Sequence, residues 1–512
     1  MMDFILNASQ IKEADRLTMQ ARSISSIQLM EKAATAWTDA FLKKLQGKKF
    51  PVDIFCGPGN NGGDGLVIAR LLHRYGFSVR VIIPDCAKKT SEDHQINLQR
   101  LQEIKNVPIL PTSGTENIPS VSDALAIDAL FGTGLNRPLD ECWKKWIQFI
   151  NTQYFLIFSV DIPSGLPTDE PFHEEFEYVR NTHVITFETI KKTFLFPETG
   201  RDILSITVVP IGWDWNLISS ENQNERVITA QVIQRIYRKR NRFSHKGTYG
   251  KVVLLAGSEQ YPGAAVLCAG GALRSGAGYV VIQAPQEVCR LVLNRYPECL
   301  TIPYLNNAPQ GLLVSDADAM VAGPGLGRSS GTEQIVKQVI HSGVPVVLDA
   351  DALNVLSENT TWLHFFSSQT ILTPHPGECD RLLGKSSSHY ERVMKCREAA
   401  QRLNAVIILK GSYSVVCVPD GTLYYNITGN AGLAKAGSGD VLSGVLGALL
   451  AQGYSATEAS LLGVYVHGRC AQLLSESYGM NSITASDLIQ TLPEAFYEIE
   501  NPGITDSSEL SL

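Results

Sequence analysis

The chain lacks the features that mark a membrane-spanning or a disulfide-stapled protein. No window approaches about 18 uninterrupted apolar residues, so no membrane span is expected. The N-terminal segment, MMDFILNASQIKEADR, has neither the basic region nor the long apolar run of a signal peptide. The ten cysteines form no CxxC pair and no Cys/His cluster at zinc spacing. We therefore expect all ten to be reduced core thiols in a cytoplasmic protein.

An excess of positive charge is also missing. The formal net charge is −7, which gives the chain no general attraction to nucleic acid or to anionic membranes. Basic side chains gather in residues 235–251, but no aromatic-interleaved module follows them, so they indicate a solvated helix face leading into a nucleotide site. The 512 residues, 44% apolar and 19% charged, predict a globular protein of two or more domains.

Strands and helical segments alternate through the first half. After two helices within residues 9–46, strands are expected at 52–56, 79–83, 124–130, 155–160, 183–187 and 206–210. This alternation is typical of a parallel, doubly wound α/β sheet. Gly57, Gly59 and Gly62 formally match GxGxxG, with Asp85 at the end of the next strand, and keep a dehydrogenase open as an alternative.

Oxygen-bearing side chains follow three of these strands. Asn61, Asp128 and Ser164 each lie in a turn at a strand's carboxyl end, where ligands bind in such sheets. Each residue alone is explained as a turn former. Together they offer hard oxygen donors suited to K⁺ or Mg²⁺, and we favour a cation site.

The second half repeats the pattern and leads to a glycine-rich loop that begins a helix. Strands are expected at 251–255, 319–321, 346–348, 370–372 and 406–409, and a hairpin at 415–419 and 422–425. Gly437-Ser438-Gly439 then precede an apolar helix, so backbone N–H groups and the helix N-terminus predict a phosphate site. Asp440 follows directly, either as a helix cap or as a base acting on whatever attacks the phosphate.

Three further polar residues in the second half have two interpretations each. His375 stands between two prolines that hold it rigidly, with Glu378 nearby, and is either structural or a group that orients a substrate. Asp349 and Asp351 hold Mg²⁺ or cap the next helix, and we favour capping for at least one of them.

Nine motifs in order resemble those of the bifunctional NAD(P)H-hydrate repair enzymes. They are GNNGGDG (59–65), DALFGTGL (128–135), VDIPSGL (160–166), KGTYGKV (246–252), GALRSGAG (271–278), AGPGLG (322–327), DADALN (349–354), TPHPGE (373–378) and GSGDVLSG (437–444). The resemblance covers about residues 5–215 and 228–495. It implies a Rossmann-like epimerase domain (1–215), a linker (216–228), a ribokinase-like α/β/α dehydratase domain (229–500) and a tail (501–512).

The resemblance implies one site for the hydrates NADHX and NADPHX in each domain. The epimerase site would contain Asn60, Asn61, Gly62, Gly63, Asp64, Gly132, Thr133, Gly134, Leu135, Asn136, Arg137, Pro138 and Asp161. Asp161 is the predicted proton-transfer residue, and Asn61, Asp128 and Ser164 would bind K⁺. The dehydratase site would contain Ala264, Gly325, His375 and the catalytic Asp440. ADP or ATP with Mg²⁺ would contact Lys410, Gly411, Ser412, Tyr413, Ser414, Asn430, Ala431, Gly432, Leu433, Ala434, Lys435, Ala436, Gly437, Ser438 and Gly439.

Two segments depart from the family pattern and bear on the shape of the epimerase site. Lys191-Lys192-Thr193 stand where KPG is usual, and Pro167-Thr168-Asp169-Glu170 follow the PSGL turn. We expect a homo-oligomer without nucleic-acid or membrane partners. The alternatives are a small-molecule kinase, which uses the same GxGD device, and a first half that only binds a ligand or partner.

Overall fold

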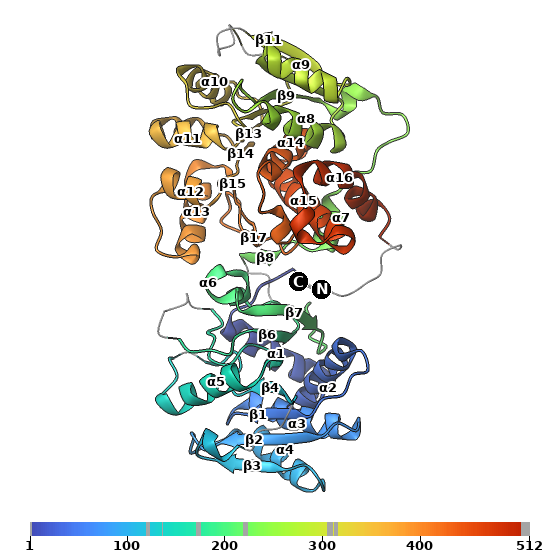
Figure 1. Ribbon diagram of the computed structural model, residues 1–512, viewed down its shortest axis with the longest axis vertical. Helices are drawn as coiled ribbons and strands as arrows, with labels where there is room; N and C mark the ends of the chain where they lie inside the picture. The colour runs from blue at the N-terminus through green and yellow to red at the C-terminus, as the bar shows by residue number, and fades with distance from the viewer. Residues whose placement is uncertain are drawn as a thin grey trace. The chain divides into compact units, whose positions relative to one another are not determined.

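The computed structural model describes residues 3–118, 123–135, 137–169, 176–218, 224–304, 311 and 316–502. The chain forms two compact units, with the boundary after residue 223 (Figure 1). Among the residues described, no helix combines the length and apolar character needed to cross a membrane.

A seven-stranded, wholly parallel sheet forms the centre of the first unit. Its strands are β1 (Val52–Cys56), β2 (Val79–Pro84), β3 (Ile109–Thr112), β4 (Leu125–Ala129), β5 (Ile157–Val160), β6 (Thr182–Phe187) and β7 (Ile203–Val209). The order β3-β2-β1-β4-β5-β6-β7 reverses between β1 and β4. This is the predicted doubly wound sheet, and the reversal creates a crevice for ligands. The sequence prediction missed β3, because Pro108 before it and Pro111 within it resemble turn signals.

Helices cover both faces of this sheet. They are α1 (Ala8–Arg22), α2 (Ser26–Leu45), α3 (Asn60–Arg74), α4 (Glu92–Gln102), α5 (Glu141–Gln153) and the short α6 (Pro197–Gly200). Trp37 of α2 and Leu66 of α3 pack with Ile54 of β1 in one buried cluster. Trp146 of α5 packs with Phe55, the next residue of β1, in another. Neighbouring strand residues thus point to opposite faces, and both faces are apolar, as in a buried parallel sheet.

The second unit is built on a ten-stranded sheet. Its strands are β8 (Glu225–Val227), β9 (Lys251–Leu255), β10 (Tyr279–Pro285), β11 (Leu300–Tyr304), β12 (Ala319–Ala322), β13 (Val346–Leu348), β14 (Thr370–Leu372), β15 (Val406–Leu409), β16 (Val415–Cys417) and β17 (Leu423–Tyr425). The order is β11-β10-β9-β12-β13-β14-β15-β16-β17-β8, and only the pairs β15–β16 and β16–β17 are antiparallel. The predicted hairpin is therefore confirmed. Strand β8 lies inside the expected linker but completes this sheet.

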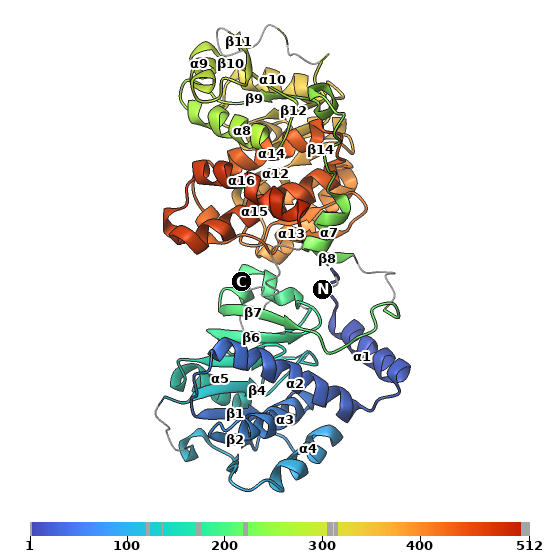
Figure 2. The same cartoon turned by 90° about the vertical axis from the view of Figure 1, so that its right-hand side faces the viewer.

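Helices form layers on both faces of the second sheet, giving an α/β/α arrangement, as the resemblance implies. They are α7 (Ala230–Ile236), α8 (Pro262–Arg274), α9 (Gln286–Arg295), α10 (Ser330–Ile340), α11 (Asp351–Glu358), α12 (Pro376–Leu383), α13 (His389–Leu403), α14 (Ser438–Ala451), α15 (Ala456–Tyr478) and α16 (Ala485–Glu500). Helices α10 to α13 lie along one face (Figure 1), and Figure 2 looks onto the other, with α8, α15 and α16. Helix α14 is buried from Val441 onward.

One disulfide contradicts the expectation that all ten cysteines are reduced. Cys86, just after β2, is bonded to Cys142 in α5, with the two Cα atoms 5.9 Å apart. Fifty-six residues separate them in sequence, and only the fold brings the end of β2 beside α5. The other eight cysteines are buried free thiols, as predicted.

Candidate active sites

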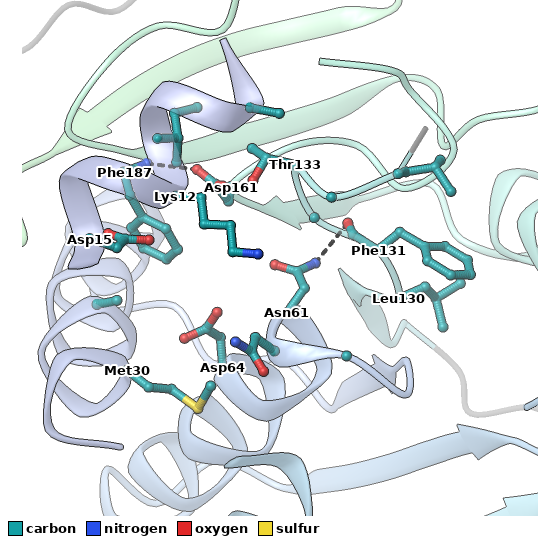
Figure 3. Close-up of a pocket in the computed structure, with 18 of the residues that line it drawn as sticks. Lys12, Asp15, Met30, Asn61, Asp64, Leu130, Phe131, Thr133, Asp161 and Phe187 are labelled. Atoms are coloured by element: carbon teal, nitrogen blue, oxygen red, sulfur yellow. Dashed lines mark hydrogen bonds between the residues drawn. The ribbon is translucent and has the colours of Figure 1, made fainter. Parts of the chain in front are cut away.

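A cavity of about 1030 Å³ lies at the carboxyl ends of β1, β4 and β5 in the first unit (Figure 3). The turns after these three strands form one side of it, and α1 and α2 form another. Gly62 lets the first turn of α3 pack closely against the turn after β1, because a Cβ at this position would lie 1.9 Å from the Gly57 carbonyl oxygen. The cavity occupies the crevice where the strand order reverses.

Most of the residues predicted for the first site line this cavity. They are Asn60, Asn61, Asp64, Gly132, Thr133, Gly134, Leu135, Arg137, Pro138 and Asp161. Gly62 and Gly63 are buried in α3 and are not among the lining residues. Asn136 lies outside the described residues.

Asp161 is held by a buried lysine. Its Oδ1 accepts hydrogen bonds from Lys191 Nζ at 2.7 Å, Thr186 Oγ1 at 3.0 Å and the Phe187 amide at 3.0 Å. The Lys191 side chain is 1% exposed. The Asp161 backbone has φ +66°, a strained conformation for a residue other than glycine. Three donors and a strained backbone fix one carboxylate at the cavity wall, which is the expected setting of a functional acid.

Two of the three predicted cation ligands contact Phe131, and the third, Asp128, contacts the amides of Ser164 and Leu130. Asn61 Nδ2 donates to the Phe131 carbonyl at 2.9 Å, and Ser164 Oγ accepts from the Phe131 amide at 2.8 Å. Asp128, fully buried, accepts from the Ser164 amide at 2.8 Å. Burial raises the pKa of Asp128, and its hydrogen bonds oppose this only in part. A buried carboxylate among neutral oxygens fits a monovalent cation, which would balance its charge.

Two further acids face the cavity. Burial raises the pKa of Asp64 well above its usual range, and the charges of Asp161, Asp15 and Asp93 add to this. Burial also raises the pKa of Asp15, on α1, to about 6, while a 2.8 Å hydrogen bond from Trp213 Nε1 opposes the rise. The site is therefore rich in carboxylates that differ in proton affinity, a pattern found at catalytic centres.

The lining residues that the sequence analysis missed include four with polar or charged groups of interest, namely Lys12, Asp15, Lys191 and Trp213. Lys12 and Asp15 are three residues apart on α1, which places them on the same helix face. Lys191 was noticed only as part of a departure from the family pattern. The tertiary fold brings Trp213 to the wall from beyond β7, and no local signal identifies it.

In the second unit, Asp440 occupies the first turn of α14. The helix begins after Gly437, whose φ of +92° is the left-handed conformation that favours glycine. Burial raises the pKa of Asp440 to about 7, and the charge of Asp349 adds to the rise while Lys410 opposes it. A carboxyl group with this pKa exchanges protons readily near neutral pH.

An ion pair between the half-buried Lys410 and the buried Asp349 lies next to this helix start. Lys410 Nζ is 2.8 Å from Asp349 Oδ1, and Ser443 Oγ of α14 donates to Asp349 Oδ2 at 2.7 Å. A Cβ on Gly439 would stand 3.5 Å from Lys410 Nζ, so the ammonium group lies close to the loop backbone. Burial alone would raise the pKa of Asp349, but Lys410 holds it below the usual range. The structure thus places a fixed positive charge at the predicted phosphate site.

The remaining predicted substrate residues of this unit have structural partners. Gly325 (φ +63°) packs on Ala264, where an added Cβ would stand 2.7 Å from the Ala264 Cβ. His375 caps α12, because its Nδ1 accepts from the Gly377 amide at 3.0 Å. Its side chain is still 51% exposed. Asp351 Oδ2 accepts from the Gly327 amide at 2.8 Å, and α11 begins without a side-chain cap. The expectation that Asp349 or Asp351 caps this helix is therefore wrong.

The predicted nucleotide residues fall into two segments. Residues 410–414 connect β15 to β16, and residues 430–439 lead into α14. Asn430 ties the second segment to α15 by donating from Nδ2 to the Ala471 carbonyl at 2.8 Å. His467 Nε2 lies 3.0 Å from the Ser438 carbonyl, and burial lowers the pKa of this imidazole to about 4. Neutral His467 therefore supports the loop as a hydrogen-bond donor.

Comparison with known proteins identifies the relatives of both units. A family model described as the N-terminus of YjeF-related proteins matches residues 26–193, and an NAD(P)H-hydrate dehydratase model matches residues 252–494. The bifunctional NAD(P)H-hydrate repair enzyme Nnr of Moorella thermoacetica is 34% identical over 97% of both chains. That of Escherichia coli is 33% identical over 89% of this chain and 86% of its own. The chain belongs to the bifunctional NAD(P)H-hydrate repair enzyme family.

A solved structure of one family domain is also similar. The ADP/ATP-dependent NAD(P)H-hydrate dehydratase of Bacillus subtilis, co-crystallised with ATP and Mg²⁺, is 33% identical and covers 53% of this chain and 98% of its own, with a TM-score of 0.47. Within this repair-enzyme chain, Lys191 lies inside the segment matched by the first family model. Helix α1 and Trp213 lie outside that segment.

Proposed function

We propose that this chain repairs hydrated NADH and NADPH in two steps. The first unit interconverts the R and S epimers at C6 of the hydrated nicotinamide ring. The second unit dehydrates the S epimer to NADH or NADPH at the expense of ADP or ATP. Family membership supports both activities.

The environment of Asp440 is the single observation on which the dehydratase assignment rests. Asp440 combines a pKa of about 7 with a place in the first turn of α14, beside the loop amides and near Lys410. In our proposal Asp440 takes the proton of the C6 hydroxyl group. The hydroxyl oxygen then attacks the terminal phosphorus of the nucleotide, whose bond to the leaving phosphate oxygen breaks. The amides of residues 437–439 stabilise the charge on the transferring group.

Elimination follows from the better leaving group. The C6–O bond breaks as inorganic phosphate leaves, and loss of a proton from C5 restores the C5–C6 double bond. Mg²⁺, when bound with the nucleotide, supplies neutralisation of the phosphate charges. Asp349 and Asp351 are already hydrogen-bonded within the protein, so the phosphate oxygens themselves would be its main ligands.

For the epimerase unit we propose Asp161 as a proton-transfer residue and Asn61, Asp128 and Ser164 as K⁺ ligands. The contacts of Lys191 keep the Asp161 carboxylate oriented at the cavity wall. A K⁺ ion would balance the buried charge of Asp128 and order the turn around Phe131. The convergence of the three ligands on that one turn supports the assignment.

Recovery of NADH absorbance from mixed NADHX epimers, with ADP or ATP, tests both activities. We expect a fast phase from the S epimer and a slower phase limited by conversion of R to S. Asp440→Asn should abolish both recoveries, while the epimers, followed by chromatography, still interconvert. Asp420→Asn, in the hairpin turn, makes the same change away from the site and should retain both phases. Appearance of a stable phosphorylated product instead of free phosphate and NADH would favour a small-molecule kinase.

A further inference from the structure

Inversion at C6 needs two proton-transfer groups, and the proposed function supplies only Asp161. If the ring opens, the C6 hydroxyl gives its proton to one carboxylate as the C6–N1 bond breaks and C6 becomes a carbonyl carbon. The electron pair of that bond moves to N1, which takes a proton from a second acid. Closure on the other face of the carbonyl reverses both transfers, so the protein ends unchanged.

We propose that Asp15 is this second acid–base group, and that Trp213 is the residue that positions it. The inference rests on the proposed epimerase function. Asp15 reaches the cavity from α1, whereas Asp161 reaches it from the end of β5 (Figure 3). The two carboxylates therefore approach a bound ring from different walls, as two separate transfers require.

The surroundings of Asp15 distinguish it from a structural acid. Among the described residues, Trp213 Nε1 is the one hydrogen-bond donor to its carboxylate, at 2.8 Å on Oδ1. A capping acid would bind backbone amides instead. The charged groups that act on Asp15 are Asp161, Glu188 and Asp64, which favour its protonated form, and Lys191, which opposes it.

Burial, together with these charges, raises the pKa of Asp15 to about 6, so both protonation states are populated near neutral pH. Asp161 differs because the Lys191 ammonium group contacts it directly. Asp161 is paired with a cation and Asp15 is not, so the two carboxylates have different environments, as the members of an acid–base pair require. The indole of Trp213 is held in turn by the segment before it, since Glu188 Oε1 accepts from the amides of Ile211, Gly212 and Trp213 at 2.6–2.9 Å.

The two-phase assay on the full-length chain isolates this role. Asp15→Asn should slow the R-epimer phase by about a hundredfold or more and leave the fast phase unchanged. Glu13→Gln is the matched control, because it removes one charge from the exposed face of the same helix. The control should retain both phases. If the parent protein shows no R-epimer phase, the epimerase function itself fails, which is a different result from failure of the Asp15 proposal.

A second variant tests Trp213 and does not depend on the folding of Asp15→Asn. The indole hydrogen bond stabilises the ionised form of Asp15, so Trp213→Phe should raise its pKa. As Asp15 must be protonated to donate, the high-pH decline of the R-epimer rate should move to higher pH. An unmoved decline overturns the proposal, and so does an R-epimer phase within about twofold of the parent in a folded Asp15→Asn protein. If Asp64→Asn shifts the high-pH decline of the R-epimer rate and the Asp15 and Trp213 variants do not, the second acid is Asp64 and the proposal is overturned as well.

Discussion

In both units one lysine holds a buried aspartate, and the lysine is buried in the first unit and half-buried in the second. Lys191 holds Asp161 at 2.7 Å, and Lys410 holds Asp349 at 2.8 Å. A buried pair of this kind contributes little net stability, but the loss of one partner leaves an uncompensated charge. These pairs therefore position functional groups, but replacement of either partner alone should destabilise the protein.

Lys191→Met should destabilise the first unit and abolish the R-epimer phase. Removal of the ammonium group leaves the Asp161 carboxylate without its cation, and we expect a loss of about 3 kcal/mol in the free energy of unfolding. Denaturant titration measures this loss. Addition of Asp161→Asn should restore most of the stability and none of the activity. Lys32→Met, on the exposed side of α2, should change neither quantity.

Asp440→Asn should stabilise the second unit at pH 8 while it abolishes dehydration. The folded-state pKa of Asp440, about 7, lies above the ordinary aspartate value of about 3.9. Between these two pKa values Asp440 ionises more readily in the unfolded chain, so the parent protein loses folding stability as the pH rises from about 4 toward 7. Partial solvent screening reduces the effect to about 2 kcal/mol. Thermal unfolding should show a higher Tm for the variant at pH 8 and equal values near pH 4.

At the scale of elements, the beginning of α14 is organised by the backbone conformation of one residue. Gly437 has φ +92° and stands against Leu267 of α8, where an added Cβ would meet Leu267 Cδ1 at 2.5 Å. The motif GSGD predicted this helix start from the sequence alone. The close crossing of α8 and α14 was not predictable, since it depends on Gly444 meeting the Cys268 carbonyl, where a Cβ would lie at 2.0 Å.

Gly437→Ala should weaken nucleotide use more than its cost in stability explains. Gly343, in the loop between α10 and β13, also has a positive φ (+72°) but has nothing within 4 Å of an added Cβ, so Gly343→Ala introduces positive-φ strain without the clash. Both variants should lose about 1 kcal/mol of stability through that strain. Only Gly437→Ala should raise the KM for ADP or ATP, by tenfold or more, because it moves the loop amides. Equal KM values in the two variants would contradict a role for this loop in nucleotide binding.

At the scale of the whole molecule, the alternation of apolar strand segments with helical segments predicted most of both sheets. The polar and glycine residues at the strand ends predicted the turns that line the sites. Strand β3 was missed because Pro108 and Pro111 resemble turn signals, and strands β8, β10 and β11 were not predicted either. The Cys86–Cys142 bond was missed because its two cysteines are 56 positions apart in the sequence. The residues Asp15, Lys191 and Trp213 were missed for a related reason. Their function depends on which distant segments pack around a cavity, and neither periodicity nor local spacing encodes that contact.

The presence of two sites in one chain predicts that the two phases of NADHX repair respond to different cations. Replacement of K⁺ by choline should slow the R-epimer phase severalfold, because the buried charge of Asp128 loses its counter-ion. The fast phase should be unaffected and should depend on Mg²⁺ with the nucleotide. Asp128→Asn keeps one acceptor oxygen for the Ser159 and Ser164 donors, but it removes the charge and the acceptor of the Leu130 amide. Its R-epimer phase should therefore be slow in either salt, and a K⁺ response as large as the parent's would place the cation elsewhere.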